Sequence, residues 1–447
     1  MKNRLLLNFC FLILTCSLSA QQASGFHSLT NKTIVVPFKF INNLIFINVE
    51  VNGVMLTFML DSGVGETLLF SLDNKEVSFN NVETIKLAGL GSANEIDGYI
   101  SKSNKVVINK NLIDTTHQII IILNEDFNFS SRVGIPINGI IGYHFFENFP
   151  VLIDYDKERI IIYPEKKKFK RIIKRQKAID LSIEKNKPYF NTDIELENKK
   201  INSKLLVDLG NSDGIWLFAK EIEGFKTPEP NFDDYLGRGF NGNIYGKRSK
   251  IKGIYMNEHY LQNPLVAIPD DSSIVSLSLV EGRKGSVGNE ILKRFNLILD
   301  YPDKKMFIEK NILFNDKFTY NMAGMDIKYD DMQWAEELLI AMELQINKTK
   351  EKKDTISEVA VNHLKYKFNL KPLYSIAEVR ANSPASKADF KEGDVLQKVN
   401  GKPANHFSLK ELNNLFFSKK GRVIKFEIKR GTEILKKTIT LEDPINP

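Results

Sequence analysis

The sequence predicts a mainly β protein made of two similar lobes, followed by a small α/β domain. Three observations support this fold class. Short strand-like segments dominate roughly the first 310 residues, three motifs recur there in the same order, and the pattern changes after the second copy. The 447 residues suffice for two or three domains of about 150 residues each. The composition, 43% hydrophobic and 26% charged, is that of a globular chain.

The first twenty residues have the pattern of a secretory signal peptide. Lys2 and Arg4 give a basic start, residues 5–14 are mostly apolar, and residues 17–20 are mostly small, as a cleavage site requires. The apolar run is shorter than the roughly 18 residues of a membrane-spanning helix. We therefore expect an exported protein that is periplasmic, bound to the cell envelope or secreted.

Both cysteines, Cys10 and Cys16, lie in this segment. The processed chain would contain no disulfide and would be held together by packing alone. A lipid anchor on Cys16 stays open as an alternative but is disfavoured, because Leu14-Thr15 is a poor match to the small residue usual before a lipidated cysteine. The six histidines are scattered singly, so we expect neither a metal nor another cofactor.

Three landmarks indicate an internal duplication. The first is an apolar segment ending in an acidic turn, and the third is an apolar segment ending in Asp-Tyr. The second, here called the glycine step, is a pair of glycines separated by two residues. The three landmarks lie at Asp61 and Asp208, at 139–142 and 285–288, and at Asp154 and Asp300. The spacings are 147, 146 and 146 residues (208 − 61, 288 − 142 and 300 − 154). Such a constant register predicts two copies of one structural unit.

Each copy is predicted to be a β lobe, the first over residues 21–170 and the second over 171–315. Short runs of Ile, Val, Phe and Tyr broken by Asn and Gly are typical of strands. The glycine-rich stretches 87–91 and 236–240 predict hairpin tips. Helices are expected only directly after the glycine steps.

A dense basic run, 166–177 (KKKFKRIIKRQK), separates the copies and contributes to the net charge of +7. Such a run is usually a solvated linker face. The alternative is contact with an anionic surface of the cell envelope. Nucleic acid is not expected as a partner of an exported protein.

The C-terminal domain is predicted over residues 316–445. Its first part holds a polar, helix-favouring stretch, which we interpret as an insertion at about 328–370. Strands are expected in LYSIAEVR, DVLQKVN, VIKFEIKR and KTITL. A helix is expected in SLKELNNLFFS, where Leu409, Leu412, Leu415 and Phe416 have helical spacing.

The acidic turns are the candidate site. A carboxylate at the end of a buried strand is costly unless a partner group compensates it. Two facing carboxylates share a proton, so that one can act as general base on a water molecule and the other as general acid. The duplication supplies such a pair in Asp61 and Asp208.

The motif Leu60-Asp61-Ser62-Gly63, together with 139–142, resembles the retropepsin and pepsin-like aspartic proteases, and the similarity covers about residues 35–310 in two lobes. The resemblance implies an endopeptidase with Asp61 and Asp208 as catalytic residues. Ser62, Gly63 and Gly210 would support them, and the glycine-rich stretches would correspond to flaps.

Leu209 departs from this pattern, because the family has Ser or Thr there. A leucine cannot make the hydroxyl hydrogen bond that braces the two active-site loops. The alternative is therefore a non-catalytic protein that binds peptides or acts as a scaffold.

Residues 210–214 also fit G-x-S-x-G around Ser212, the pattern of a serine-hydrolase elbow between a strand and a helix. The repeat argues against this interpretation, because residues 63–67 of the first copy continue from the acidic turn into a strand.

The C-terminal domain resembles a PDZ domain in 382–386 (Asn-Ser-Pro-Ala-Ser), 391–396 and 399–402. The resemblance implies capture of an extended peptide at a sheet edge, with loop N–H groups on its C-terminal carboxylate. Gly324, Met325 and Ile327 would belong to that loop and its strand. A purely structural appendage is the alternative.

Overall fold

A computed structural model of the chain describes residues 25–87, 96–122, 130–197, 199–239, 242–274, 279–346 and 358–445. The predicted signal segment with Cys10 and Cys16, residues 88–91 of the first predicted hairpin tip and residue 240 of the second lie outside the described residues. Within the described ranges, no helix is long and apolar enough to cross a membrane.

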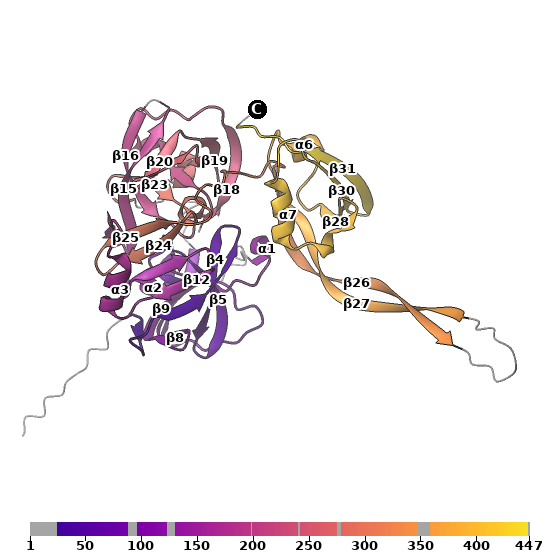
Figure 1. The fold of residues 1–447 in the computed structure, drawn as a ribbon, viewed down its shortest axis with the longest axis horizontal. Coiled ribbons are helices and arrows are strands. Elements are labelled where there is room, and N and C mark those ends of the chain that lie inside the picture. Colours follow the sequence, from indigo (N-terminus) through magenta and orange to yellow (C-terminus); the bar gives the residue numbers. More distant parts are fainter. Residues whose placement is uncertain are drawn as a thin grey trace, which may run out of the picture.

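The first lobe is built on a nine-stranded sheet (Figure 1). Its strands are β1 (His27–Ser28), β3 (Lys39–Ile41), β4 (Leu44–Val51), β5 (Val54–Leu60), β6 (Thr67–Leu69), β7 (Val82–Leu87), β8 (Ile96–Ile108), β9 (Leu112–Ile121) and β10 (Gly139–Ile141). Buried and accessible residues alternate along β4 and β5, as expected for strands with one face on the core. β10 runs parallel to β5, with Ile141 opposite Leu60.

A ten-stranded sheet repeats this arrangement in the second lobe. Its strands are β14 (Ser182–Glu184), β15 (Lys187–Leu196), β16 (Lys199–Val207), β17 (Ile215–Leu217), β18 (Phe232–Gly239), β19 (Gly242–Lys250), β20 (Gly253–Met256), β21 (His259–Gln262), β22 (Leu265–Pro269) and β23 (Arg283–Val287). β23 runs parallel to β16, with Val287 opposite Val207. These are the repeat equivalents of Ile141 and Leu60, so the predicted duplication extends to strand pairing.

A six-stranded sheet joins the lobes. Its strands are β2 (Ile34–Pro37), β11 (Val151–Asp154), β12 (Arg159–Ile162), β13 (Ile179–Asp180), β24 (Phe295–Asp300) and β25 (Lys305–Lys310). At its centre Leu152 pairs with Ile298. These residues are 146 apart (298 − 152), the spacing of the repeat, so an approximate twofold axis passes between them. One hydrophobic core spans both lobes.

Short helices connect the strands of the lobes. They are α1 (Ser130–Val133), α2 (Tyr143–Phe146), α3 (Lys166–Ile173), η2 (Ala219–Glu221), α4 (Asp271–Ile274) and α5 (Asn289–Leu292). α2 and α5 follow the glycine steps as predicted. The expectation that helices occur only there is wrong. The basic run forms α3, because Phe169 and Ile173, one turn apart, pack against the six-stranded sheet.

The C-terminal domain contains one further sheet and its own core. Its elements are β26 (Met325–Ile346), β27 (Glu358–Val379), α6 (Pro384–Lys387), β28 (Val395–Val399), β29 (Lys402–Pro403), η3 (Ala404–His406), α7 (Leu409–Phe416), β30 (Val423–Arg430) and β31 (Glu433–Thr440). Leu409, Leu412 and Phe416 of α7 are buried in this core, as their spacing predicted, whereas Leu415 is only partly buried. The Ser408 side chain caps α7.

The helix-favouring stretch predicted at the start of this domain is a strand instead. β26 pairs with β27 from Met325 opposite Val379 to Ile346 opposite Glu358, and the hairpin projects from the domain (Figure 1). Main-chain pairing with a neighbouring strand overrides the local helix preference of its Ala, Glu, Leu and Met residues.

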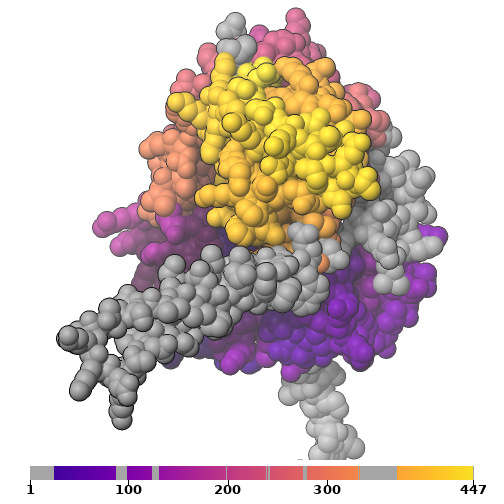
Figure 2. All heavy atoms as spheres, turned by 90° about the vertical axis from the view of Figure 1, so that its right-hand side faces the viewer, coloured from indigo at the N-terminus to yellow at the C-terminus, as the bar shows by residue number. Residues whose placement is uncertain are grey.

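The C-terminal domain packs on both lobes and lies in front of them in Figure 2. Leu265 of β22 is part of its hydrophobic core. Residues of α1 contact β26, and a Cβ atom on Gly134 would lie 3.3 Å from Leu409. The three units therefore form one connected body.

Candidate active site

Asp61 and Asp208 follow two buried strands that occupy equivalent places in the two lobes. β5 leads into Asp61 and β16 into Asp208. The main-chain N–H of Asp61 donates to the oxygen of Ile141 at 3.0 Å, and that of Asp208 donates to the oxygen of Val287 at 2.9 Å. Each acidic turn is therefore held by the strand of its own glycine step.

Two glycines let the turns approach each other closely. A Cβ atom on Gly210 would lie 2.1 Å from Oδ2 of Asp61, and one on Gly63 would lie 2.8 Å from Oδ1 of Asp208. A side chain at either position would displace the carboxylate of the opposite lobe. The Gly63 N–H also donates to Oδ1 of Asp61 at 2.7 Å. The structure thus brings the two predicted carboxylates together.

The two carboxyl groups lie close enough for the charge of one to act on the other. Burial, and then the negative charge of Asp208, raise the pKa of Asp61 to about 7. Burial also raises the pKa of Asp208, although Arg283 and Lys187 act in the opposite direction. Such a pair retains a shared proton in mildly acidic solution, so one member can accept a proton while the other donates one.

Ser62 joins the two turns across the lobes. Its hydroxyl donates to the oxygen of Val207 at 2.7 Å and accepts the N–H of Leu209 at 3.0 Å. Leu209 stands at the equivalent position of the second turn, where it is fully buried in the shared core. Leu209 has no hydroxyl that could make the equivalent hydrogen bonds to the first turn. Of the expected brace, only the half that Ser62 provides exists.

Asn289 and Tyr155, which sequence reasoning missed, hold the Leu209 turn from another side. The side-chain amide of Asn289 donates to the oxygen of Leu209 at 2.6 Å, and the Tyr155 hydroxyl donates to Oδ1 of Asn289 at 2.7 Å. Asn289 belongs to the second lobe and Tyr155 to the first, so this chain also crosses the lobes. The repeat offered one signal for these two positions. The residue equivalent to Asn289 in the first copy is Tyr143 (289 − 146), and the residue equivalent to Tyr155 in the second copy is Tyr301 (155 + 146).

Lys187 and Arg283, also missed, place positive charge near the carboxyl pair. Lys187 begins β15 and Arg283 begins β23. Arg283 is buried, and its guanidinium lies 5.1 Å from the ring centroid of Phe218. Burial lowers the pKa of both cations, and their charges lower that of Asp208. Lys187 also lowers the pKa of Asp61, whereas Arg283 acts on Asp208, so Arg283 favours Asp208 as the ionised member of the pair.

A chain of ion pairs connects the Asp208 turn to the C-terminal domain. Arg248 of β19 contacts Asp213, just after the turn, and Asp234 of β18, at 2.7 Å each. Arg380 of the C-terminal domain approaches Asp234 at 3.6 Å. The β18–β19 hairpin thus links the domain to the second acidic turn.

The context predicted for a serine-hydrolase elbow is absent around Ser212. The residues after it form strand β17, not a helix, as the equivalent residues of the first lobe form β6. Among the described residues, Ser212 makes no hydrogen bond to a histidine, and its main-chain oxygen accepts from the side chain of Asn43 at 3.0 Å. The repeat, rather than the G-x-S-x-G match, describes this turn.

The predicted peptide-binding loop of the C-terminal domain has its N–H groups occupied. The N–H groups of Ala323 and Gly324 donate to Oδ1 of Asn321 at 3.1 and 3.0 Å. Met325 and Ile327 have buried side chains in the domain core. A peptide carboxylate could use these two donors only by displacing Asn321.

Comparison with known proteins identifies the C-terminal domain. Residues 347–441 match the PDZ domain family, which confirms the predicted PDZ domain over this range. Gly324, Met325 and Ile327 precede the matched residues. No curated protein matches the chain. The protein is therefore a mainly β chain with a C-terminal PDZ domain, a module for peptide recognition or scaffolding.

Proposed function

We propose that this chain is an exported aspartic-type endopeptidase with a two-lobed, pepsin-like architecture. The observation that best supports the proposal is the close pair of Asp61 and Asp208, built from equivalent turns of a duplicated β lobe. A buried like-charge pair is unfavourable for folding alone and is expected where a shared proton has a chemical use. The signal-like segment 1–20 supports export.

In this proposal Asp208, favoured as the ionised member by Arg283, accepts a proton from a water molecule. Asp61, whose pKa is raised to about 7, keeps a proton and donates it to the oxygen of the scissile amide. The water oxygen attacks the carbonyl carbon and forms a tetrahedral intermediate, with no covalent bond to the chain. The C–N bond then breaks as Asp208 passes its proton to the leaving amine nitrogen, and Asp61 takes back a proton from a hydroxyl of the intermediate. Ser62, Gly63 and Gly210 hold the geometry on which the rate depends.

The PDZ domain would contribute peptide or protein recognition. Its ion-pair contact with the β18–β19 hairpin places it beside the hairpin that corresponds to a flap in our proposal. Extended segments held by the domain would thus be presented near the proposed cleft.

One observation favours a second candidate, a peptide-binding protein without catalysis. Leu209 is fully buried where the resemblance implies a hydroxyl, so Ser62 alone provides the reciprocal brace. A carboxyl pair that is held less rigidly would still bind a peptide, but it would lose rate.

A peptide-library assay with mass-spectrometric detection tests both candidates. The wild-type chain is compared with Asp61→Asn, Asp208→Asn and Ser212→Ala, each checked for folding by circular dichroism. We expect cleavage by the wild type and Ser212→Ala, and none by either Asn variant. Peptide retention without cleavage at any pH would instead support the binding protein. Loss of activity in Ser212→Ala alone would support the serine hydrolase.

A further inference from the structure

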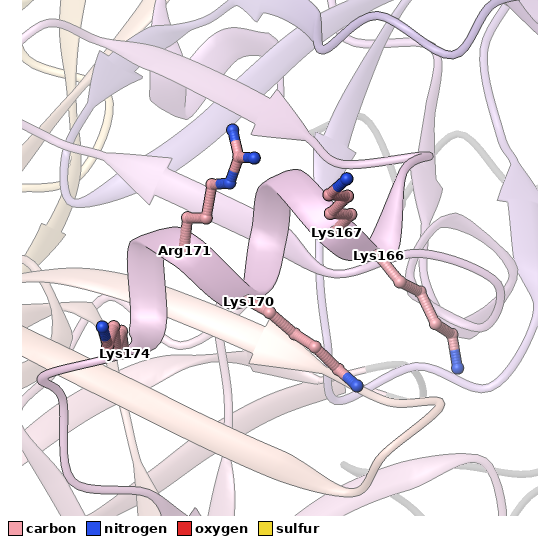
Figure 3. A pocket seen from close by; sticks show the side chains of 5 residues that line it. All are labelled: Lys166, Lys167, Lys170, Arg171 and Lys174. Carbon is pink, nitrogen blue, oxygen red and sulfur yellow. The ribbon is translucent and has the colours of Figure 1, made fainter.

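The helix α3 carries a basic surface that the proposed peptidase does not use. Eight of the twelve residues from Lys166 to Lys177 are Lys or Arg, and none is acidic. Five of them line a shallow hollow on the surface and spread outward from the helix (Figure 3): Lys166, Lys167, Lys170, Arg171 and Lys174. All five are exposed.

The inner side of α3 explains why this charge is held in place. Phe169 is 3% exposed, and its ring centroid lies 5.7 Å from that of Tyr163 and 6.2 Å from that of Phe307. The Lys168 ammonium donates to the main-chain oxygen of Asn31 at 3.3 Å. The helix is therefore fixed to the outer face of the six-stranded sheet, and its cations form a preformed surface.

Acidic neighbours neutralise little of this surface. Two ion pairs are formed among its cations and the described acidic residues, by Lys166 with Asp303 at 3.7 Å and by Lys168 with Glu165 at 3.0 Å. The Lys166 pair is long, and its side chains are 70% and 55% exposed, so water screens it. Lys167, Lys170, Arg171 and Lys174 remain available to an anionic partner.

Apolar side chains accompany the charge. Ile172 is 41% exposed on α3, between Arg171 and Lys174. Under the helix, a row of paired residues crosses the sheet through Ile298, Leu152 and Ile161. The row ends at Val35, which is also 41% exposed. Cations interspersed with exposed aliphatic groups suit the interface of a membrane, where charge meets headgroups and an apolar side chain enters the acyl boundary.

We propose that the α3 surface binds an anionic lipid bilayer. Lysine predominates over arginine in the run, and its one aromatic residue, Phe169, is buried, so neither bidentate phosphate contacts nor base stacking is favoured. Charge and exposed aliphatic side chains together favour a lipid surface over nucleic acid. Because α3 and the PDZ domain lie on opposite sides of the molecule (Figure 1), binding through α3 leaves the PDZ domain facing away from the bilayer.

Vesicle sedimentation with the full chain tests this surface. The vesicles contain either phosphatidylcholine alone or phosphatidylcholine with phosphatidylglycerol. The test variant is Lys167→Glu/Lys170→Glu/Lys174→Glu, and the matched control is Lys402→Glu/Lys425→Glu/Lys429→Glu. The control changes the net charge equally, but on exposed residues of the PDZ domain. All variants keep residues 1–24, so binding through that segment is a constant background.

We expect the wild type to prefer the anionic vesicles. At about fivefold for each lysine removed, the α3 variant should lose at least on the order of 100-fold in partitioning, and the control should change little. Raising the salt from 0.1 to 1 M should release the protein, because the Debye length falls from about 10 Å to about 3 Å. Equal binding to both vesicle types, or an equal loss in the control, would overturn the proposal. So would binding of a single-stranded oligonucleotide that depends on α3 while vesicles are not bound.

Discussion

The side-chain amide of Asn289 donates a hydrogen bond to the main-chain oxygen of Leu209 at 2.6 Å, and this bond reinforces the turn that has lost its hydroxyl. The Tyr155 hydroxyl orients the amide by donating to its oxygen. All three residues are buried, so water cannot hydrogen-bond to these polar groups, and each bond satisfies a group that would otherwise stay unpaired. The second acidic turn is therefore held by Ser62 on one side and by an Asn-Tyr pair on the other.

Tyr155→Phe and Tyr301→Phe form a matched pair of substitutions. Tyr155→Phe leaves Oδ1 of Asn289 buried without its donor and should lower the free energy of unfolding by about 1–3 kcal/mol. Tyr301 is the repeat equivalent, and its buried hydroxyl has no hydrogen-bond partner within the described residues, so Tyr301→Phe should be neutral or stabilising. Urea denaturation measures both, and equal losses would contradict the assigned role of Tyr155.

Ser62→Ala should be among the more damaging single-atom deletions in the lobes. It leaves the oxygen of Val207 and the N–H of Leu209 without their partner and should cost about 2–4 kcal/mol. In the proposed enzyme it should also lower kcat, because the two turns lose their shared contact. Ser212→Ala, at an exposed serine, is the control. A Ser62→Ala protein as stable as this control would show that the brace is dispensable.

Stability should depend on pH through Asp61. Its pKa is raised to about 7 by burial and by Asp208, whereas an unfolded aspartate titrates near 4. Between these values the folded chain binds more protons than the unfolded chain, so the free energy of unfolding falls as the pH rises from about 4 to about 7.

The substitution Asp61→Asn isolates this effect. In the variant, the free energy of unfolding should fall less steeply as the pH rises from about 4 to about 7. Contributions from other groups, such as His144, are the same in both proteins and cancel when the two are compared. Urea denaturation at pH 4.5, 6 and 7.5 gives the two slopes. Identical slopes would show that Asp61 does not titrate in this range.

The PDZ loop should gain peptide affinity when its internal acceptor is removed. Asn321→Ala frees the N–H groups of Ala323 and Gly324, which can then hold a terminal carboxylate. Fluorescence anisotropy should show tighter binding of a peptide with a free C-terminus, and no gain for the same peptide when it is amidated. Equal gains for both peptides would argue against carboxylate capture by this loop.

The repeat is why so much of the candidate site was predictable. Landmarks 146 or 147 residues apart indicated equivalent turns, and a twofold arrangement brings such turns together. Lys187 and Arg283 lie 21 residues before and 75 residues after Asp208 (208 − 187 and 283 − 208), on strands whose local sequence carries no sign of a site. Their proximity to the dyad depends on sheet order, which spacing alone does not determine.

Two elements show where local patterns were insufficient. In α3 the apolar stripe is limited to Phe169 and Ile173 among many cations, so charge concealed the helical period. In β26 the composition favours a helix, but pairing with β27 determines the backbone. In both cases a non-local contact decides the structure.

The pH dependence of kcat/KM for a cleaved peptide tests the central claim most directly, with wild type, Asp61→Asn and Asp208→Asn measured together. A dyad that shares one proton predicts activity in acidic to neutral solution that falls above about pH 7, where Asp61 loses its proton. Both Asn variants should be folded and inactive. Activity that persists in both variants, or that rises through pH 7 to a plateau, would contradict a catalytic pair formed by Asp61 and Asp208.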